Sequence, residues 1–275
     1  MTRRALFTRR HLLEAGVAIG AAGPWAIARP QSDADGTLGD QVEFRRLVAA
    51  NRVLANEGVV DAFGHASVRH PQFPDRYVMS RSRSPALVEF SDLMEFDRQT
   101  GDPLDARGRR AYGERMIHGA VYEARPEINA VVHHHAYDVL PFSVTSTPLR
   151  PVIHTASVIG AEVPVWDIAE NFGATDMLVR TMEMGRDLAR TLGQNRCLLM
   201  RGHGAVVTGE SLQEAVVTAI YLQVNARILL QAQSLGEPRG LSEDEIPLSR
   251  GAQLSPLAME RVWEYLCLRA GVDPV

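Results

Sequence analysis

One apolar stretch of this chain ends in three consecutive histidines, Val131-Val132-His133-His134-His135. Because side chains in a strand alternate between the two faces of the sheet, His133 and His135 are expected on one face and His134 on the other. Two imidazoles at this spacing can bind the same metal ion from one side of a sheet. The run therefore predicts a strand that ends in a metal site, with a set of ordinary hydrogen-bonded histidines as the alternative.

A third nitrogen ligand follows a second apolar stretch. His203 lies in the segment RGHGA, directly after the apolar residues 197–200. Three histidines with an open fourth position are the ligand count of a catalytic zinc-type site, not of a closed structural site. Zinc is the expected ion, although three imidazoles also accept manganese, cobalt or iron. His134 is expected to pack or to support a ligand.

A carboxylate precedes the histidine strand in the chain. Glu114 stands near the start of a segment with helical spacing, residues 112–124, and His118 follows four positions later, on the same expected helix face. A carboxylate beside three histidines can act as a fourth ligand or carry a proton. The alternative is a solvated glutamate in the first turn of a helix.

Length and composition limit the class of protein. The chain has 275 residues, 45% of them hydrophobic, which suffices for one domain with a full core. A net charge of -4 gives no indication of nucleic-acid binding. The two cysteines, Cys197 and Cys267, are too few for a disulfide framework. After the N-terminus the sequence has no uninterrupted apolar segment of about 18 residues, so a polytopic membrane protein is not expected.

The N-terminal segment has the features of an export signal. Arg9 and Arg10 precede a weakly apolar stretch that ends in Ala26-Ile27-Ala28, a small-x-small cleavage pattern. This order is typical of twin-arginine signals and predicts a periplasmic protein with no membrane contact after cleavage. The alternatives are a basic tail and a cytoplasmic location. The expected divisions are the signal at residues 1–28, a linker at 29–39 and one domain at 40–275.

Helical and strand patterns intermix along the domain without a regular βαβ repeat. This predicts an α/β domain whose mixed or largely antiparallel sheet is sandwiched by helices. The expected helices cover residues 42–58, a short segment from Ser91, 112–124, a short segment after Ala136, 176–192 and 211–235. The expected extended segments are 66–70, 76–80, the histidine strand, 151–154, 163–166 and a strand pair at 197–208.

Four motifs in order resemble the class II aldolase/adducin family. They are Gly64-His65-Ala66-Ser67, Glu114 with His118, His133-x-His135, and Gly202-His203-Gly204, spread over about residues 40–235. The resemblance implies a three-layer α/β/α sandwich around a mostly antiparallel sheet. It also implies a divalent metal, often zinc, on His133, His135 and His203, with Glu114 as the acid/base group. A homotetramer with active sites at subunit interfaces is implied in the same way.

The chain departs from the family's sugar-phosphate aldolases where these bind phosphate. Tyr112 and Gly113 replace a Ser-Ser pair, and His65 replaces the asparagine of a Gly-Asn pair. Ser82-Arg83 replaces a Thr-Gly loop, and guanidinium groups bind planar carboxylates bidentately. We therefore expect a small carboxylate as substrate. The alternative is that these arginines belong to an ordinary solvated loop and bind no substrate. The candidate substrate-binding residues are His65, Ser67, Arg81, Ser82 and Arg83.

These departures are similar to those in metal-dependent decarboxylases of aromatic breakdown, such as those acting on hydroxy-carboxymuconic semialdehyde or dihydroxyphthalate. Retro-aldol cleavage and decarboxylation both leave a carbanion next to a carbonyl, so one metal-stabilised enolate serves both reactions. The expected activity is decarboxylation of a hydroxy or keto carboxylic acid, with Glu114 or His154 protonating the enolate. An aldolase or epimerase acting on a non-phosphorylated sugar or hydroxy acid is the first alternative, and a non-catalytic adducin-like module is the second.

Overall fold

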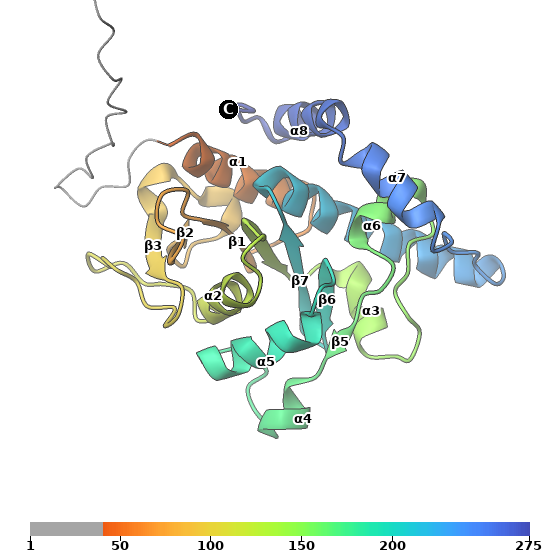
Figure 1. Ribbon diagram of the computed structural model, residues 1–275, viewed down its shortest axis with the longest axis horizontal. Helices are drawn as coiled ribbons and strands as arrows, with labels where there is room; N and C mark the ends of the chain where they lie inside the picture. Colours follow the sequence, from red (N-terminus) through yellow and green to blue (C-terminus); the bar gives the residue numbers. More distant parts are fainter. Residues whose placement is uncertain (1–40) are drawn as a thin grey trace, which may run out of the picture. The chain divides into compact units, whose positions relative to one another are not determined.

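The computed structural model describes residues 41–275 and consists of a seven-stranded sheet with helices on both faces (Figure 1). The expected signal and linker lie outside the described residues. The strand order is β3-β2-β1-β4-β7-β6-β5, and every neighbouring pair is antiparallel except β5 with β6. The strands are β1 (His65–Arg69), β2 (Arg76–Ser80), β3 (Leu93–Asp97), β4 (Ala130–His134), β5 (Val165–Trp166), β6 (Cys197–Met200) and β7 (Gly204–Gly209).

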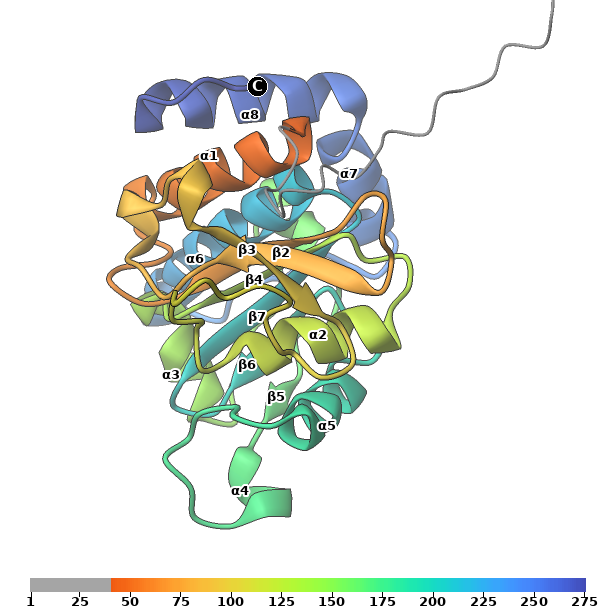
Figure 2. The ribbon, with the colours of Figure 1, turned by 90° about the vertical axis from the view of Figure 1, so that its left-hand side faces the viewer.

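The helices form two layers around this sheet, which confirms the expected three-layer sandwich (Figure 2). On one face α1 (Val42–Asn56) packs on β1, and α6 (Leu212–Leu235) packs on β4 and β7. On the other face α2 (Arg115–Ala124) and α5 (Met182–Leu192) pack against each other and on β4 and β6. The outer helices are α7 (Glu245–Gln253) and α8 (Pro256–Ala270), and the short ones are α3 (Leu140–Ser143) and α4 (Ile168–Phe172).

Side-chain alternation along the central strand β4 produces a separate core on each face. Ala130 and Val132 belong to the core beneath α1 and α6, whereas Val131 belongs to the core beneath α2 and α5. A strand buried on both faces reads as a continuous apolar run. The same alternation places His133, two residues after Val131, on the α2 face and His134 on the α6 face. The fold therefore directs the first predicted ligand toward Glu114.

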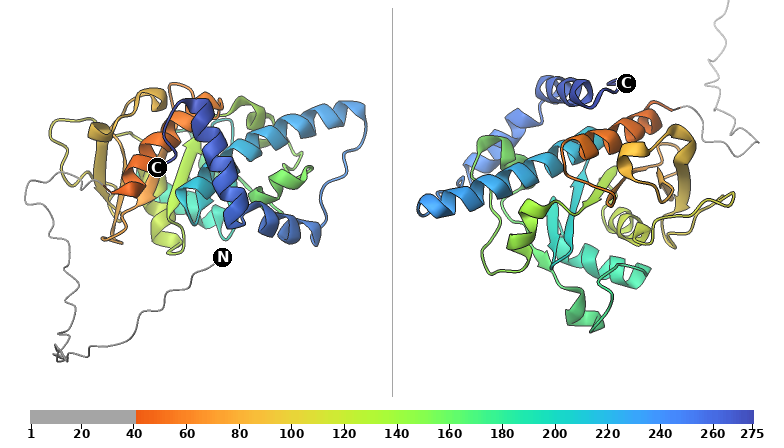
Figure 3. Two further views of the ribbon diagram at one scale, coloured as in Figure 1. Left: turned by 90° about the horizontal axis from the view of Figure 1, so that it is seen from above. Right: turned by 180° about the vertical axis from the view of Figure 1, so that it is seen from behind.

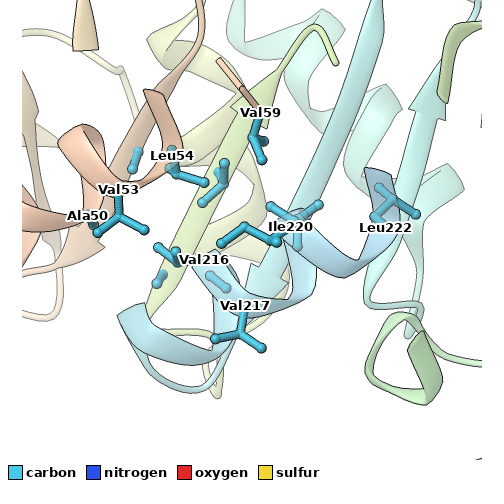
Figure 4. Packing of buried hydrophobic residues seen from close by; sticks show 14 of the residues in the cluster. Ala50, Val53, Leu54, Val59, Val216, Val217, Ile220 and Leu222 are labelled. Atoms are coloured by element: carbon cyan, nitrogen blue, oxygen red, sulfur yellow. The ribbon is translucent and has the colours of Figure 1, made fainter. Parts of the chain in front are cut away.

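The core beneath α1 and α6 depends on close packing of the two helices. Figure 4 shows Val53 and Leu54 of α1 near Val216 and Ile220 of α6. Helix α6 begins where the Ser211 Oγ accepts a hydrogen bond from the Glu214 N–H at 3.2 Å, as the sequence predicted. Its length and apolar composition would also suit a membrane span, but most of it is buried in this core. Its far end extends beyond the sheet (Figure 3).

Several expected elements differ from those observed. Residues 93–97 form strand β3 after a single 3-10 turn at Phe90–Asp92, because their period-two pattern pairs with β2. Helix α5 begins at Met182, six residues later than predicted, where Thr181 caps it by accepting from the Met184 N–H. Residues 151–154 are not a strand, and a 3-10 helix covers His154–Ile159. The sequence patterns missed α7 and α8 altogether.

Candidate metal centre

Three histidine side chains and one carboxylate converge between β4, the β6–β7 turn and the start of α2. His135 Nε2 lies 3.0 Å from His133 Nε2 and 3.1 Å from His203 Nε2. Glu114 Oε2 lies 3.5 Å from the Nε2 atoms of both His133 and His203. The four ligand atoms all lie within 4.8 Å of one another. The predicted ligands and the predicted carboxylate thus form one group.

Hydrogen bonds at the outer edge of this group fix which nitrogen of each ring faces inward. His133 donates Nδ1–H to the Ala205 carbonyl at 3.1 Å, and His203 donates Nδ1–H to the Met177 carbonyl at 2.8 Å. A neutral imidazole that donates from Nδ1 carries a lone pair on Nε2, which is the form that binds a metal. Glu114 is held in the same way, because its Oε1 accepts the Val179 N–H at 3.0 Å.

The spacing and the charge of the group both fit a divalent metal ion. A tetrahedral zinc ion with Zn–N bonds of about 2.0–2.1 Å separates two ligand nitrogens by about 3.3 Å, close to the observed spacing. Burial lowers the pKa of His135 to about 3, which keeps its nitrogens free of an extra proton. Burial would raise the pKa of Glu114, but His133 and His203 hold it well below its usual range. Burial would lower the pKa of His203, but Glu114 raises it. The space between them therefore favours a positive charge.

Two glycines allow the surrounding strands to approach β4 closely enough to form the group. A Cβ on Gly204 would lie 2.2 Å from the His134 carbonyl oxygen and 2.8 Å from His135 Cδ2. Gly64 has a φ of +91°, and a Cβ there would lie 3.0 Å from the His133 carbonyl oxygen. A positive φ at this value is readily adopted only by glycine. The glycines in the GHAS and RGHGA motifs thus have a steric role in positioning the ligands.

The first-loop motif lies beside the metal centre. His65 pairs with His133 across β1 and β4, and the two rings are 5.2 Å apart. His65 Nδ1 is hydrogen-bonded to His118 Nε2, and Ser67 Oγ is hydrogen-bonded to His118 Nδ1. Ser67, predicted to bind substrate, is fully buried, and its Oγ lies 2.6 Å from His118 Nδ1. Glu114 belongs to the metal-ligand group, whereas His118 contacts His65 and Ser67. The two are separated because Glu114 occupies the N-cap position ahead of α2.

The two arginines that were expected to bind a substrate carboxylate, Arg81 and Arg83, bind a carboxylate of the chain itself. Arg81 Nε bonds Asp92 Oδ1 and Arg83 Nη1 bonds Asp92 Oδ2, each at 2.6 Å. Burial would raise the pKa of Asp92, but bonds from the Glu89 N–H and the two arginines lower it overall. Ser82 between them is exposed, and its N–H donates to the Arg110 carbonyl. Arg83 is linked to Tyr112 beside the centre, because the Tyr112 hydroxyl donates to the Arg83 carbonyl.

His154 is another predicted site residue that the structure does not bring to the centre. Its side chain is exposed, and its carbonyl accepts hydrogen bonds from Ser157 and from Ser249 of α7. Among the described residues no contact joins it to the four-residue group. Of the two residues predicted to protonate the enolate, Glu114 is the one that lies in the four-residue group of this chain.

Sequence reasoning missed the aromatic residues that border the centre. The Tyr112 ring lies 4.5 Å from the His65 ring, and the Phe63 ring lies 6.4 Å from the His135 ring. Phe63 is 66% exposed, which is unusual for a phenylalanine next to a polar site. Their positions in the sequence indicate this proximity, because Phe63 precedes the GHAS motif and Tyr112 lies two residues before Glu114.

Comparison with known proteins agrees with this geometry. Residues 45–230 match the family described as the class II aldolase and adducin N-terminal domain. The chain is 35% identical to decarboxylase tropJ of Talaromyces stipitatus, covering 70% of this chain and 77% of that protein. It is 31% identical to 3,4-dihydroxyphthalate decarboxylase of a Terrabacter species, covering 70% and 82%.

A solved structure shows the same fold. L-fuculose 1-phosphate aldolase from Glaciozyma antarctica superposes with a TM-score of 0.65 at 24% identity, covering 84% of this chain and 92% of that one. Its sequence similarity is too low to carry more than the fold. Decarboxylases and aldolases are both carbon–carbon lyases, consistent with a metal-dependent lyase site in this chain. The chain belongs to the class II aldolase and adducin family, in its decarboxylase-like branch.

Proposed function

We propose that this protein is a divalent-metal-dependent decarboxylase of a hydroxylated aromatic carboxylic acid. The observation that carries the proposal is the intact group of three histidines and Glu114, bordered by residues that cannot form the family's phosphate site. Where sugar-phosphate aldolases have small polar residues, this chain places the Tyr112 ring against the His65 ring. The site therefore lacks the side chains that bind a sugar phosphate, and it offers an aromatic surface to a planar substrate.

The aromatic borders support a ring-shaped substrate. Tyr112 and Phe63 lie near different histidines of the centre, at His65 and His135 respectively. An exposed phenylalanine at this place offers apolar area to a ligand at little cost in side-chain ordering. Arg83, bound to Asp92 on one side and to the Tyr112 hydroxyl through its carbonyl, is the cation that we assign to a substrate carboxylate. The relatives named as decarboxylases support the same substrate class.

His133, His135 and His203 would hold the metal, with Glu114 beside them. A divalent ion bound there supplies positive charge that stabilises the anion left when CO2 departs. Glu114 begins the cycle as a carboxylate and accepts the proton of the substrate hydroxyl. Glu114 then delivers this proton to the ring carbon that bears the carboxylate. The bond between that carbon and the carboxylate breaks, CO2 leaves, and the electron pair of the bond restores the aromatic ring and the negative charge on the substrate oxygen. The Val179 N–H holds Glu114 Oε1, so Oε2 is the oxygen that transfers the proton.

The test is CO2 release from 3,4-dihydroxyphthalate by the protein supplied with Zn²⁺, Mn²⁺, Co²⁺ or Fe²⁺ in turn. Metal-dependent CO2 release supports the proposal and identifies the effective ion. Cleavage of a hydroxy acid or sugar to an aldehyde, with no CO2, would favour the aldolase alternative. That alternative is retained because the fold is shared with an L-fuculose 1-phosphate aldolase.

We also propose a homotetramer located in the periplasm. The assembly is the one that the family resemblance implies, and the location follows from the arginine pair and the small-residue pattern in residues 1–28. Light scattering of the purified protein tests the tetramer. N-terminal sequencing after expression in a bacterium with twin-arginine export tests the location, and an uncleaved cytoplasmic chain would contradict it.

A further inference from the structure

A continuous run of four buried side chains leads from the interior of the protein to the wall of the metal centre. The Tyr122 hydroxyl lies 2.8 Å from Ser67 Oγ, which lies 2.6 Å from His118 Nδ1. His118 Nε2 lies 2.7 Å from His65 Nδ1. All four side chains are buried, and His65 is the only one of them with measurable exposure, at 3%. None of the four belongs to the group of metal ligands.

The number of protons in this run determines the direction of its hydrogen bonds. Within residues 41–275, Ser67 is the only side chain that the Tyr122 hydroxyl contacts, so the phenol proton is satisfied by donation to Ser67. Ser67 has a single proton, which is then donated to His118 Nδ1. A neutral His118 consequently carries its proton on Nε2 and donates it to His65 Nδ1. His65 in turn keeps its own proton on Nε2.

Both histidines in the run are neutral, which makes this order unambiguous. Burial lowers the pKa of His118 to about 3, and the neighbouring His133 acts in the same direction. His65 Nδ1 accepts the His118 proton, so the nitrogen of His65 that carries a proton is Nε2. A divalent cation bound beside them would oppose a second proton on either ring even more strongly. Each ring therefore has one donor and one acceptor.

The protonated nitrogen of His65 is the one that does not contact His118. The two nitrogens of an imidazole point in widely different directions, so Nε2 points away from His118. The His133 and Tyr112 rings flank His65 at 5.2 and 4.5 Å. Among the described residues no hydrogen bond to Nε2 is found, and Nε2 is not one of the fully buried polar atoms that lack a partner, so it is open to the space outside the run. An N–H in this place is available to donate to a ligand oxygen.

We propose that His65 donates its Nε2–H to an oxygen of the bound substrate, and that Ser67, His118 and Tyr122 are positioning residues that fix this tautomer. The nature of the oxygen rests on the proposed function: a hydroxyl or carboxylate oxygen next to the metal is anionic and accepts such a bond. The opposite tautomer would present a lone pair, which repels an anionic oxygen and competes for the metal. Three buried residues thus determine what His65 can bind.

The tautomer can be read directly by nitrogen-15 spectroscopy of histidine-labelled, zinc-loaded protein, with His65→Asn and His118→Asn for assignment. Long-range proton–nitrogen correlations distinguish the Nε2–H form from the Nδ1–H form. The proposal expects Nε2–H for both His65 and His118. An Nδ1–H form of His65 overturns it. This measurement needs no turnover, so it decides the inference even if the protein fails to decarboxylate 3,4-dihydroxyphthalate.

Kinetics of a matched pair of variants test the consequence. Ser67→Ala removes the donor to His118 and is expected to raise KM for 3,4-dihydroxyphthalate about three- to tenfold, the effect of one lost hydrogen bond, with kcat and bound metal little changed. Ser67→Thr keeps the hydroxyl and should restore KM. Ser157→Ala removes another buried serine hydroxyl, outside the run, and should leave KM as it is. A wild-type KM in Ser67→Ala overturns the proposal; if that variant does not fold, the tautomer of the wild type decides.

Discussion

Arg81 and Arg83 both hydrogen-bond Asp92, and replacing each of them in turn should give different results for substrate binding. Arg81→Ala and Arg83→Ala each remove one 2.6 Å bond to the same carboxylate, whose side chain is 5% exposed. A hydrogen bond to a charged group contributes about 1.5–3 kcal/mol, and partial exposure of both guanidinium groups reduces this to about 1–2 kcal/mol. Each variant should therefore lower Tm by roughly 2–8 °C.

Only Arg83→Ala should also weaken substrate binding. The Tyr112 hydroxyl donates to the main-chain carbonyl of Arg83, and Tyr112 packs on His65 beside the metal centre, so this bond places the Arg83 side chain near the centre; among the described residues no hydrogen bond joins Arg81 to Tyr112. Loss of a charged contact to a substrate carboxylate should raise KM about tenfold or more. The assays are calorimetric melting and steady-state kinetics with 3,4-dihydroxyphthalate. Equal KM values in the two variants would remove Arg83 from the substrate site, and unchanged melting in both would refute the pairing with Asp92.

Three further perturbations address the centre and its support. Glu114→Gln should keep the metal but lose about 10²- to 10⁴-fold in kcat, and full turnover would refute the proton-transfer role. Gly204→Ala should lower Tm and metal content, because its Cβ would lie 2.2 Å from the His134 carbonyl oxygen; a variant with wild-type melting and metal content would contradict this. Because the pKa of Asp92 is lowered in the folded state, its charge stabilises the protein at neutral pH, and this stabilisation is lost as pH falls through that pKa. The Tm difference between wild type and Asp92→Asn should accordingly shrink below about pH 4, and a constant difference would count against the ion pairs.

The sequence predicted the metal ligands because their signal is local. The i, i+2 spacing of His133 and His135 determines their shared face once β4 is recognised as a strand, and His203 follows another apolar strand. The absence of a regular βαβ repeat also predicted a mixed or largely antiparallel sheet, and the helix expected over residues 211–235 begins at its Ser211 cap. In each case neighbouring residues alone decide the geometry.

The second set of contacts depends on residues far apart in the chain. Asp92 and the arginine loop meet through the β2–β3 pairing, and β3 was mistaken for a helix. Ser67, His118 and Tyr122 come from β1 and α2, so their hydrogen bonds appear only when the helix packs on the sheet. His154 was expected to protonate the enolate, whereas the structure places its main chain against α7, where its carbonyl accepts from Ser249. Sequence patterns carry no direct signal of such packing.

Metal content of the purified protein tests the central claim most directly. We predict stoichiometric divalent metal in the wild type, its loss in His135→Ala, and its retention in His134→Gln, the adjacent histidine that faces the opposite side of the sheet. Elemental analysis after exchange against metal-free buffer, with circular dichroism as a folding control, gives the answer. A folded wild type without stoichiometric metal, or a His135→Ala variant that retains it, would contradict the account of this site.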